Sequence, residues 1–244
     1  MQISRRDTLV LLSAASALAL SGAGVSAAEG DRHDQALLLS STQGLTDHVI
    51  GSETAPVTVI EYASPTCPHC ATFHNDVYPA FKTQYIDTGK VRFIVRPFLR
   101  NVQDAVVFMV AEAGGPENFH NIIETYFRTQ SQWAVAEKPG NALRAIAKQL
   151  GFTDETFNAA LTNQPLYNAM EAMKTEALKT FDLEGTPTFY VNGKQLTGDK
   201  TLVQLAAEID PLVPADFVPV AATEPNAMAA EPNAMAAEPV TPAP

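Results

Sequence analysis

The stretch Cys67-Pro68-His69-Cys70 contains both cysteines of this 244-residue chain, separated by two residues. An apolar run, Val57–Tyr62, precedes the stretch, and apolar residues at helical spacing follow it. The run predicts a buried strand, and the spacing predicts a helix with the first cysteine at its N-terminal end. A close cysteine pair at such a junction is typical of a redox-active dithiol, which becomes a disulfide when oxidised.

The predicted position of Cys67 favours its thiolate, the species that attacks disulfides. Free N–H groups in the first turn of a helix stabilise negative charge, so we expect a lowered pKa for Cys67. Pro68 suits the first helical position, because its missing N–H would have no partner there. His69 can add positive charge or a donor beside the sulfur. A stabilised thiolate stabilises the reduced form, and the pair is therefore expected to oxidise other dithiols.

Two further residues complete the expected chemistry. Cys70 lies one helical turn inward, where we expect it to resolve mixed disulfides. Glu61 lies six residues before Cys67 on the apolar strand. If it is buried, its pKa is raised and it could exchange protons with Cys70. The alternative is an outward-facing strand residue without a redox role.

Residues 1–27 have the features of an export signal peptide. Arg5 and Arg6 precede an apolar stretch, and small residues end at Ala27. The apolar stretch is too short for a stable transmembrane span. Its start also resembles a twin-arginine signal, and ordinary unfolded export fits equally well. We expect the mature chain in a bacterial periplasm, where oxidising conditions suit a catalytic cysteine pair.

The chain is acidic, with a formal net charge of −11. Loss of two arginines and one aspartate with the signal peptide changes this value to −12. Proteins that bind nucleic acid neutralise its phosphates with Lys and Arg, so this balance argues against a nucleic-acid partner.

Hydrophobic patterning divides the remaining chain into five segments. A polar N-terminal segment precedes an α/β core, which a helical insertion splits in two. The tail is rich in Pro and Ala, and we expect disorder there because it offers little apolar surface to bury. The segments are residues 28–47 (N-terminal segment), 48–100 (core, first part), 101–181 (insertion), 182–212 (core, second part) and 213–244 (tail).

In the first part of the core, Val91–Phe98 is expected to form the next strand after Val57–Tyr62. The helix between them makes a β-α-β unit, which predicts a parallel sheet. Pro79 predicts a kink or break of that helix just before it. Val49 and Ile50 can form a short edge strand.

The insertion shows helical periodicity throughout. After it, Phe189–Val191, the turn residues Asn192 and Gly193, and Gln195–Thr197 predict a β-hairpin, followed by a helix over Thr201–Ile209. The helices expected within the insertion lie near Gln103–Ala113, Glu117–Tyr126, Asn141–Leu150, Thr153–Thr162 and Pro165–Thr180.

The segment Gly185–Phe189, with the sequence Gly-Thr-Pro-Thr-Phe, follows the insertion and leads into the hairpin. The order of strand, Cys-Pro-His-Cys, helix, strand, helical insertion, Thr-Pro and hairpin resembles the DsbA-like thiol–disulfide oxidoreductases of the thioredoxin superfamily. The resemblance covers most of the mature chain. It implies an α/β protein with a thioredoxin fold and an inserted all-helical domain, acting as a periplasmic enzyme that introduces disulfide bonds into exported proteins.

The resemblance also implies roles for individual residues. Cys67 and Cys70 would be the catalytic disulfide, and Pro187 would be in the cis form beside it. The backbone of Thr186 would pair with an extended substrate segment, bringing a substrate sulfur to Cys67. Glu61 matches the acidic residue that such proteins have on the strand before the motif.

The implied partners are unfolded or newly exported proteins as substrates and a membrane quinone-coupled oxidase of the DsbB type as reoxidant. We expect a monomer without cofactor or metal. Thr186 departs from the best-known enterobacterial DsbA, which has Val there, whereas Thr is usual in disulfide isomerases. An isomerase or reductase of the same fold is therefore an alternative, although we expect none of the long N-terminal dimerisation domain of the isomerases here.

Metal binding is a further alternative, because Cys67, Cys70 and His74 could be ligands. A fourth ligand is missing from the local pattern, so His74 is interpreted as a surface or packing residue. A copper-binding metallochaperone of the same fold would normally have a wider cysteine spacing. A purely structural disulfide is disfavoured, since so short a loop restrains little of the unfolded chain. The other histidines interpreted as surface or packing residues are His33, His48 and His120.

Overall fold

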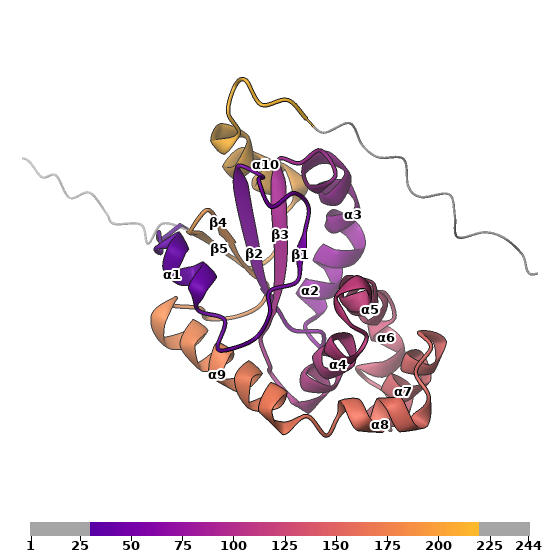
Figure 1. The fold of residues 1–244 in the computed structure, drawn as a ribbon. Coiled ribbons are helices and arrows are strands. Elements are labelled where there is room, and N and C mark those ends of the chain that lie inside the picture. Colours follow the sequence, from indigo (N-terminus) through magenta and orange to yellow (C-terminus); the bar gives the residue numbers. More distant parts are fainter. Residues whose placement is uncertain (1–29, 220–244) are drawn as a thin grey trace, which may run out of the picture.

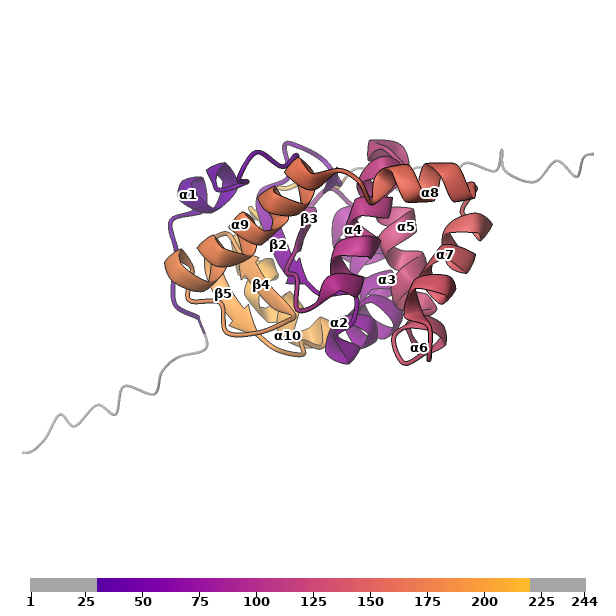
Figure 2. The same cartoon turned by 90° about the horizontal axis from the view of Figure 1, so that it is seen from below.

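In a computed structural model, the residues described are 30–219, and they form a five-stranded sheet with helices on both faces (Figures 1 and 2). The strand order is β1-β3-β2-β4-β5. The predicted signal peptide and residues 220–244 of the predicted tail lie outside the described residues. The strands are β1 (Val49–Ile50), β2 (Val57–Ala63), β3 (Val91–Pro97), β4 (Thr188–Val191) and β5 (Lys194–Thr197).

The sheet is mixed rather than parallel. β2 and β3 are parallel, as the β-α-β unit predicts, but β1 runs antiparallel to β3 at the edge. β4 runs antiparallel to β2 and to β5. The expectation of a parallel sheet therefore holds for this pair alone, because the insertion returns the chain to the sheet at the end where β3 leaves it, which makes β4 antiparallel to β2.

Helices cover both faces of the sheet, so every residue of β2 is buried. Val59 and Ala63 belong to a large apolar cluster shared with the helices that follow the cysteine motif and with α10 (Leu202–Ile209). Ile60 and Tyr62 belong to a second cluster on the other face, covered by α1 (Gln35–Ser40) and α9 (Gln164–Thr180) (Figure 2). The two-residue period of a strand assigns Glu61 to the face of Val59 and Ala63.

The helix after the cysteine motif changes type along its length. α2 (Pro68–Thr72) passes into a π-helical segment, Phe73–Val77 (η1), then α3 (Tyr78–Phe81) and a second π-helical segment, Lys82–Ile86 (η2). Pro79 has no N–H to donate, and wider π turns are a known way to accommodate such a loss. The expected break is therefore a local change of helix type just before the proline.

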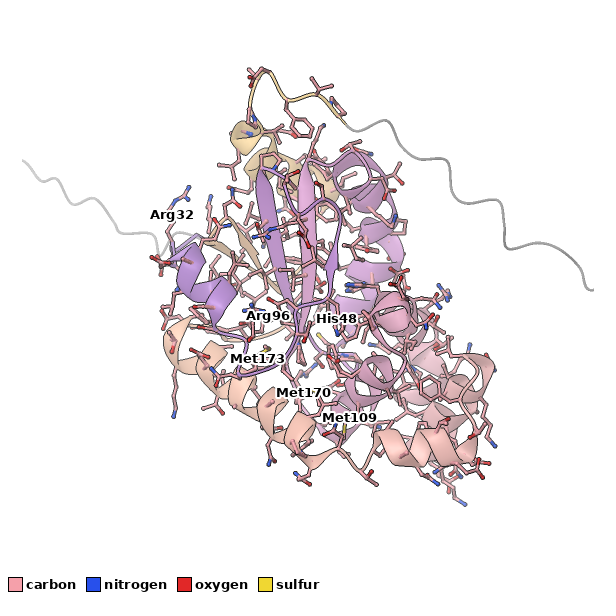
Figure 3. All side chains as sticks on the ribbon, in the orientation of Figure 1. Arg32, His48, Arg96, Met109, Met170 and Met173 are labelled. Atoms are coloured by element: carbon pink, nitrogen blue, oxygen red, sulfur yellow. The ribbon has the colours of Figure 1, made fainter. Side chains whose placement is uncertain are left out.

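Six helices lie between β3 and β4. The sequence missed α6, because four residues are too few to show a helical period. α9 leaves the other helices of the insertion and crosses to the sheet, where Met173 joins the second cluster (Figures 1 and 3). The six are α4 (Val102–Ala113), α5 (Pro116–Arg128), α6 (Gln130–Trp133), α7 (Pro139–Gln149), α8 (Asp154–Ala160) and α9 (Gln164–Thr180).

The predicted hairpin joins β4 to β5. Asn192 and Gly193 have φ angles of 44° and 85°, the positive values that a type I′ turn requires at both central positions. Thr201 caps α10 in a capping box with Gln204, and a short 3₁₀ turn, Asp210–Leu212 (η3), follows the helix.

Arg96 anchors the N-terminal segment to the sheet (Figure 3). Its guanidinium, 1% exposed, donates to the carbonyl of Leu38 at 2.8 Å and to the hydroxyl of Tyr62 at 3.1 Å. It also donates to both carboxylate oxygens of Asp47, at 2.9 and 2.6 Å. This network holds α1 (Gln35–Ser40) against the second cluster.

Two histidines without evident partners in the sequence have partners in the fold. His48, labelled in Figure 3, bonds Glu112 at 3.1 Å and stacks on Phe119. His120 bonds the backbone carbonyl of His48, and burial lowers the pKa of His120 to about 4. Within residues 30–219, no helix combines the length and apolar character needed to cross a lipid bilayer.

Candidate active site

The two cysteines lie where β2 gives way to α2. Cys67 is the N-cap residue of α2, and Pro68 takes the first helical position as predicted. Both cysteines are free thiols. Cys67 is 3% exposed and Cys70 is completely buried, so only the first sulfur can meet a substrate.

The surroundings of the two thiols lower the pKa of Cys67 and raise the pKa of Cys70. Hydrogen bonding from the Cys70 thiol is the main reason that the pKa of Cys67 is lowered to about 5. Thr186 and the backbone N–H groups of His69 and Cys70 lower it further, against an opposing effect of burial. Burial raises the pKa of Cys70, and Cys67 and the Glu61 carboxylate raise it further. The geometry therefore favours a thiolate at Cys67 and a neutral thiol at the more deeply buried Cys70.

We expect alkylation of Cys67 in the reduced protein to be half-maximal near pH 5, rather than near the usual thiol pKa of about 8.5. The lowered pKa stabilises the folded reduced protein above the pKa of the unfolded thiol. That stabilisation is lost as the pH falls through about 5. The measurement is the pH dependence of the iodoacetamide reaction, read by mass spectrometry. Cys70→Ala should move the midpoint upward, and an alkaline midpoint in the unsubstituted protein would contradict the assignment.

The Thr-Pro segment lies directly against the dithiol. The Cys67 thiol donates to the backbone carbonyl of Thr186 at 3.2 Å, although the two residues are 119 positions apart. The Thr186–Pro187 peptide bond is cis, which confirms what the family resemblance implied. Among the described residues, the buried Thr186 hydroxyl has no hydrogen-bond partner.

His69 contributes a donor beside the Cys67 sulfur through its backbone N–H rather than through its ring. Its ring is exposed and pairs with the Asp199 carboxylate at 2.7 Å, in the loop between β5 and α10. An exposed pair of this kind is strongly screened by water. His69 lowers the pKa of Cys67 through its backbone N–H.

Glu61 is fully buried, so the alternative of an outward-facing strand residue is wrong. Its Oε2 lies 2.9 Å from Nε2 of His74, a residue interpreted from sequence as surface or packing. His74 is also buried, and its ring stacks on Phe127 with centroids 4.1 Å apart. The signal that could have found it is its spacing, four residues after the inward-facing Cys70.

Two residues of the helical insertion hold the loop before Cys67. The buried carboxylate of Asp104 accepts from the Thr66 backbone N–H at 2.7 Å and from the Ser64 hydroxyl at 2.9 Å. The Gln130 side chain donates to the carbonyls of Pro65 and Cys67, at 2.7 and 2.9 Å. Sequence reasoning missed both, because each is far from the motif in the chain.

Metal ligation was the competing interpretation of the cysteines. Across residues 30–219, no three His, Cys, Asp or Glu side chains are grouped so that they could hold a metal ion. His74, the third candidate ligand, pairs with Glu61 instead.

Known proteins share this arrangement. A relative from Rickettsia bellii, named as a protein-disulfide oxidoreductase, is 34% identical over 168 residues, which cover 67% of this chain and 63% of the relative. Disulfide bond formation protein D of Bacillus subtilis is 26% identical over 60% of this chain and 68% of its own length. The chain spans about three fifths of the length of the Rickettsia relatives.

Solved structures agree with these matches. The crystal structure of alpha-DsbA1 from Wolbachia pipientis is 27% identical and superposes with a TM-score of 0.67, covering 74% of this chain and 96% of that protein. The thioredoxin family model matches residues 43–211, from the segment before β1 to η3. This match, together with a helical insertion shared with DsbA proteins, shows that the chain belongs to the thioredoxin family, in its DsbA-like group.

Proposed function

We propose that this protein is a thiol–disulfide oxidoreductase that introduces disulfide bonds into exported proteins. The observation that carries the proposal is the position of the Cys67 sulfur, at the start of α2, above the buried Cys70 and against the Thr186 carbonyl, an arrangement that lowers its pKa to about 5. A strongly stabilised thiolate makes the disulfide easy to reduce, which favours oxidation of a substrate dithiol. The names of the Rickettsia and Bacillus relatives support the same chemistry.

The reaction proceeds by two exchanges. A substrate thiolate attacks the Cys67 sulfur of the oxidised protein, forming a mixed disulfide and breaking the Cys67–Cys70 bond. Cys70 leaves with the electron pair and takes up a proton. A second substrate thiolate then attacks its own partner sulfur in the mixed disulfide. The substrate disulfide forms, and Cys67 leaves as the stabilised thiolate.

The remaining site residues support these exchanges. The Thr186 backbone, beside the Cys67 sulfur and next to Pro187, binds an extended substrate segment. Pro68 and the backbone of His69 set the acidity of Cys67 at the helix start. Glu61 exchanges a proton with Cys70, whose pKa is raised by burial and further by the charge of Glu61.

We place this chemistry in a periplasm, where the protein would meet unfolded or newly exported chains. The N-terminal pattern of arginines, apolar residues and small residues supports export. Restoring the Cys67–Cys70 disulfide needs an electron acceptor, and the DsbA-like group implies a membrane quinone-coupled oxidase of the DsbB type.

The equilibrium of the dithiol with a glutathione redox series tests the proposal. We expect a midpoint nearer the value of about −120 mV typical of a strong oxidant than the value of about −270 mV of thioredoxin. Thiol alkylation and a gel shift report the reduced fraction, and the Cys70→Ser variant controls for alkylation unrelated to the disulfide. A midpoint at or below that of thioredoxin would contradict the oxidase role and favour a reductase or isomerase.

A further inference from the structure

A buried acid–base pair lies behind the dithiol. The side chains of Glu61 and His74 are 0% and 2% exposed, and 2.9 Å separates Oε2 of the first from Nε2 of the second. Among the described residues, their remaining polar atoms, Oε1 and Nδ1, have no hydrogen-bond partner. Buried polar atoms normally make hydrogen bonds. Two such atoms without a partner, on one bonded pair, therefore indicate a site that can bond water or exchange a proton with it.

A cavity of about 350 Å³ begins at His74. It lies between α5 and the helix that follows the cysteine motif, which run side by side (Figure 1). Tyr78, Lys82, Glu124 and Arg128 also line it, whereas neither cysteine does. The cavity is polar and large enough for several water molecules. It therefore offers water to His74 at a place separate from the Cys67 sulfur.

Charges on every neighbouring element surround His74. Burial raises the pKa of Glu124, and His74 acts in the opposite direction. Burial also raises the pKa of Tyr78, and the charge of Glu124 raises it further. The titratable and charged groups that face His74 or share its cavity are Glu61 (β2), Cys70 (α2), Tyr78 (α3), Lys82 (η2), Asp87 after η2, and His120, Glu124 and Arg128 (α5).

We propose that His74 relays protons between the Glu61 carboxylate and water in this cavity, so that Cys70 is protonated from a side of the molecule that substrate does not cover. The inference rests on the proposed function and adds a residue and a route to it. His74 is a positioning and relay residue, because it acts on the sulfur only through Glu61.

The relay balances in protons and electrons. When the Cys67–Cys70 bond breaks, Cys70 leaves as a thiolate that holds the electron pair of the broken bond. One proton passes from the His74 imidazolium through the Glu61 carboxylate to that sulfur, so that Glu61 ends as a carboxylate again. His74 then regains a proton from cavity water, and the hydroxide that remains is neutralised by bulk solvent. The net transfer is one proton from solvent to Cys70, and no further oxidant or reductant is involved.

The test measures the first exchange in a single turnover. Oxidised protein is mixed with a dithiol peptide, quenched with acid and alkylated, and the release of Cys70 is followed by mass spectrometry. His74→Gln keeps a donor for Glu61 but cannot relay a proton. We expect Cys70 release to slow by about a hundredfold, the usual size of a general acid–base contribution. Alkylation of Cys67 in the reduced variant should keep its normal rate and midpoint.

A matched control variant and a chemical rescue distinguish proton relay by His74 from a purely structural role. His120→Gln changes another buried histidine, on α5, and should leave Cys70 release unchanged. His74→Ala opens space beside the cavity, and added imidazole should restore its rate without affecting His120→Ala. A normal rate of Cys70 release in His74→Gln would overturn the relay. An equally large decrease in the rate of Cys67 alkylation in that variant would also overturn it. Failure of the unsubstituted protein to exchange with the peptide would instead contradict the proposed function.

Discussion

Replacing Cys67 by Ser is expected to reduce dithiol oxidation to the uncatalysed background. The change removes the only sulfur that a substrate can reach, because Cys70 is completely buried beneath it. A serine hydroxyl forms no disulfide, so neither the mixed disulfide nor the internal one can exist. The measurement is the rate at which the oxidised protein converts a reduced two-cysteine peptide into its disulfide, separated by chromatography.

The matched variant is Cys70→Ser, which keeps the attacking sulfur. Its Cys67 thiolate should attack substrate disulfides and accumulate mixed disulfides, because Cys70 can no longer attack the Cys67 sulfur and expel the substrate thiolate. Mass spectrometry of the purified variant should show covalent adducts on Cys67, and Cys67→Ser should show none. Full peptide oxidation by Cys67→Ser, or adducts on Cys70 instead, would overturn the mechanism.

Replacing Arg96 by Ala is expected to lower the free energy of unfolding by about 3–5 kcal/mol, the usual cost of removing one partner from a buried ion pair. The guanidinium is the donor for the Asp47 carboxylate, the Leu38 carbonyl and the Tyr62 hydroxyl. Its removal leaves these acceptors beneath α1 without a charged donor. Because whole domains have about 5–15 kcal/mol of stability, the loss is large. Urea unfolding of the reduced protein, followed by circular dichroism, measures it.

Arg92→Ala is the control on the same strand. Arg92 is only partly buried and donates to one hydroxyl, that of Thr58, at 2.7 Å. Its loss should cost about 1 kcal/mol. The double variant Arg96→Ala/Asp47→Ala should lose less than the sum of the single losses, since Asp47 no longer carries an unpaired charge. Equal costs for Arg92→Ala and Arg96→Ala would show that the buried network contributes little.

The structural elements that depend on a few neighbouring residues were predictable. The apolar run ending at Tyr62, the proline after Cys67 and the turn at Asn192 each led to an element that the structure contains. These signals depend on strand alternation, helix capping and turn geometry, which are determined by residues close together in the chain. The cis form of Pro187 was different, because only the family resemblance implied it, and cis bonds are a minority before proline in general.

Contacts between distant segments were not predictable from local pattern. Whether Glu61 faced the interior stayed open, because the sequence does not show that the helical segment carrying His74 would pack over the face of the sheet on which Glu61 lies. The same limit hid the bond between His69 and Asp199, 130 residues apart, and the role of Asp104, 38 residues after Thr66. Such hydrogen-bond partners are determined by how the helices and strands pack.

The sequence by itself determined the dithiol, its place at the start of a helix, and the alternation of strand and helix around it. Each follows from the chemistry and spacing of adjacent residues. The tertiary structure alone decided that Thr186 lies against Cys67, that Glu61 is buried and that His74 connects it to a cavity. The physical reason is that burial and hydrogen-bond partners across a sheet depend on how whole elements pack.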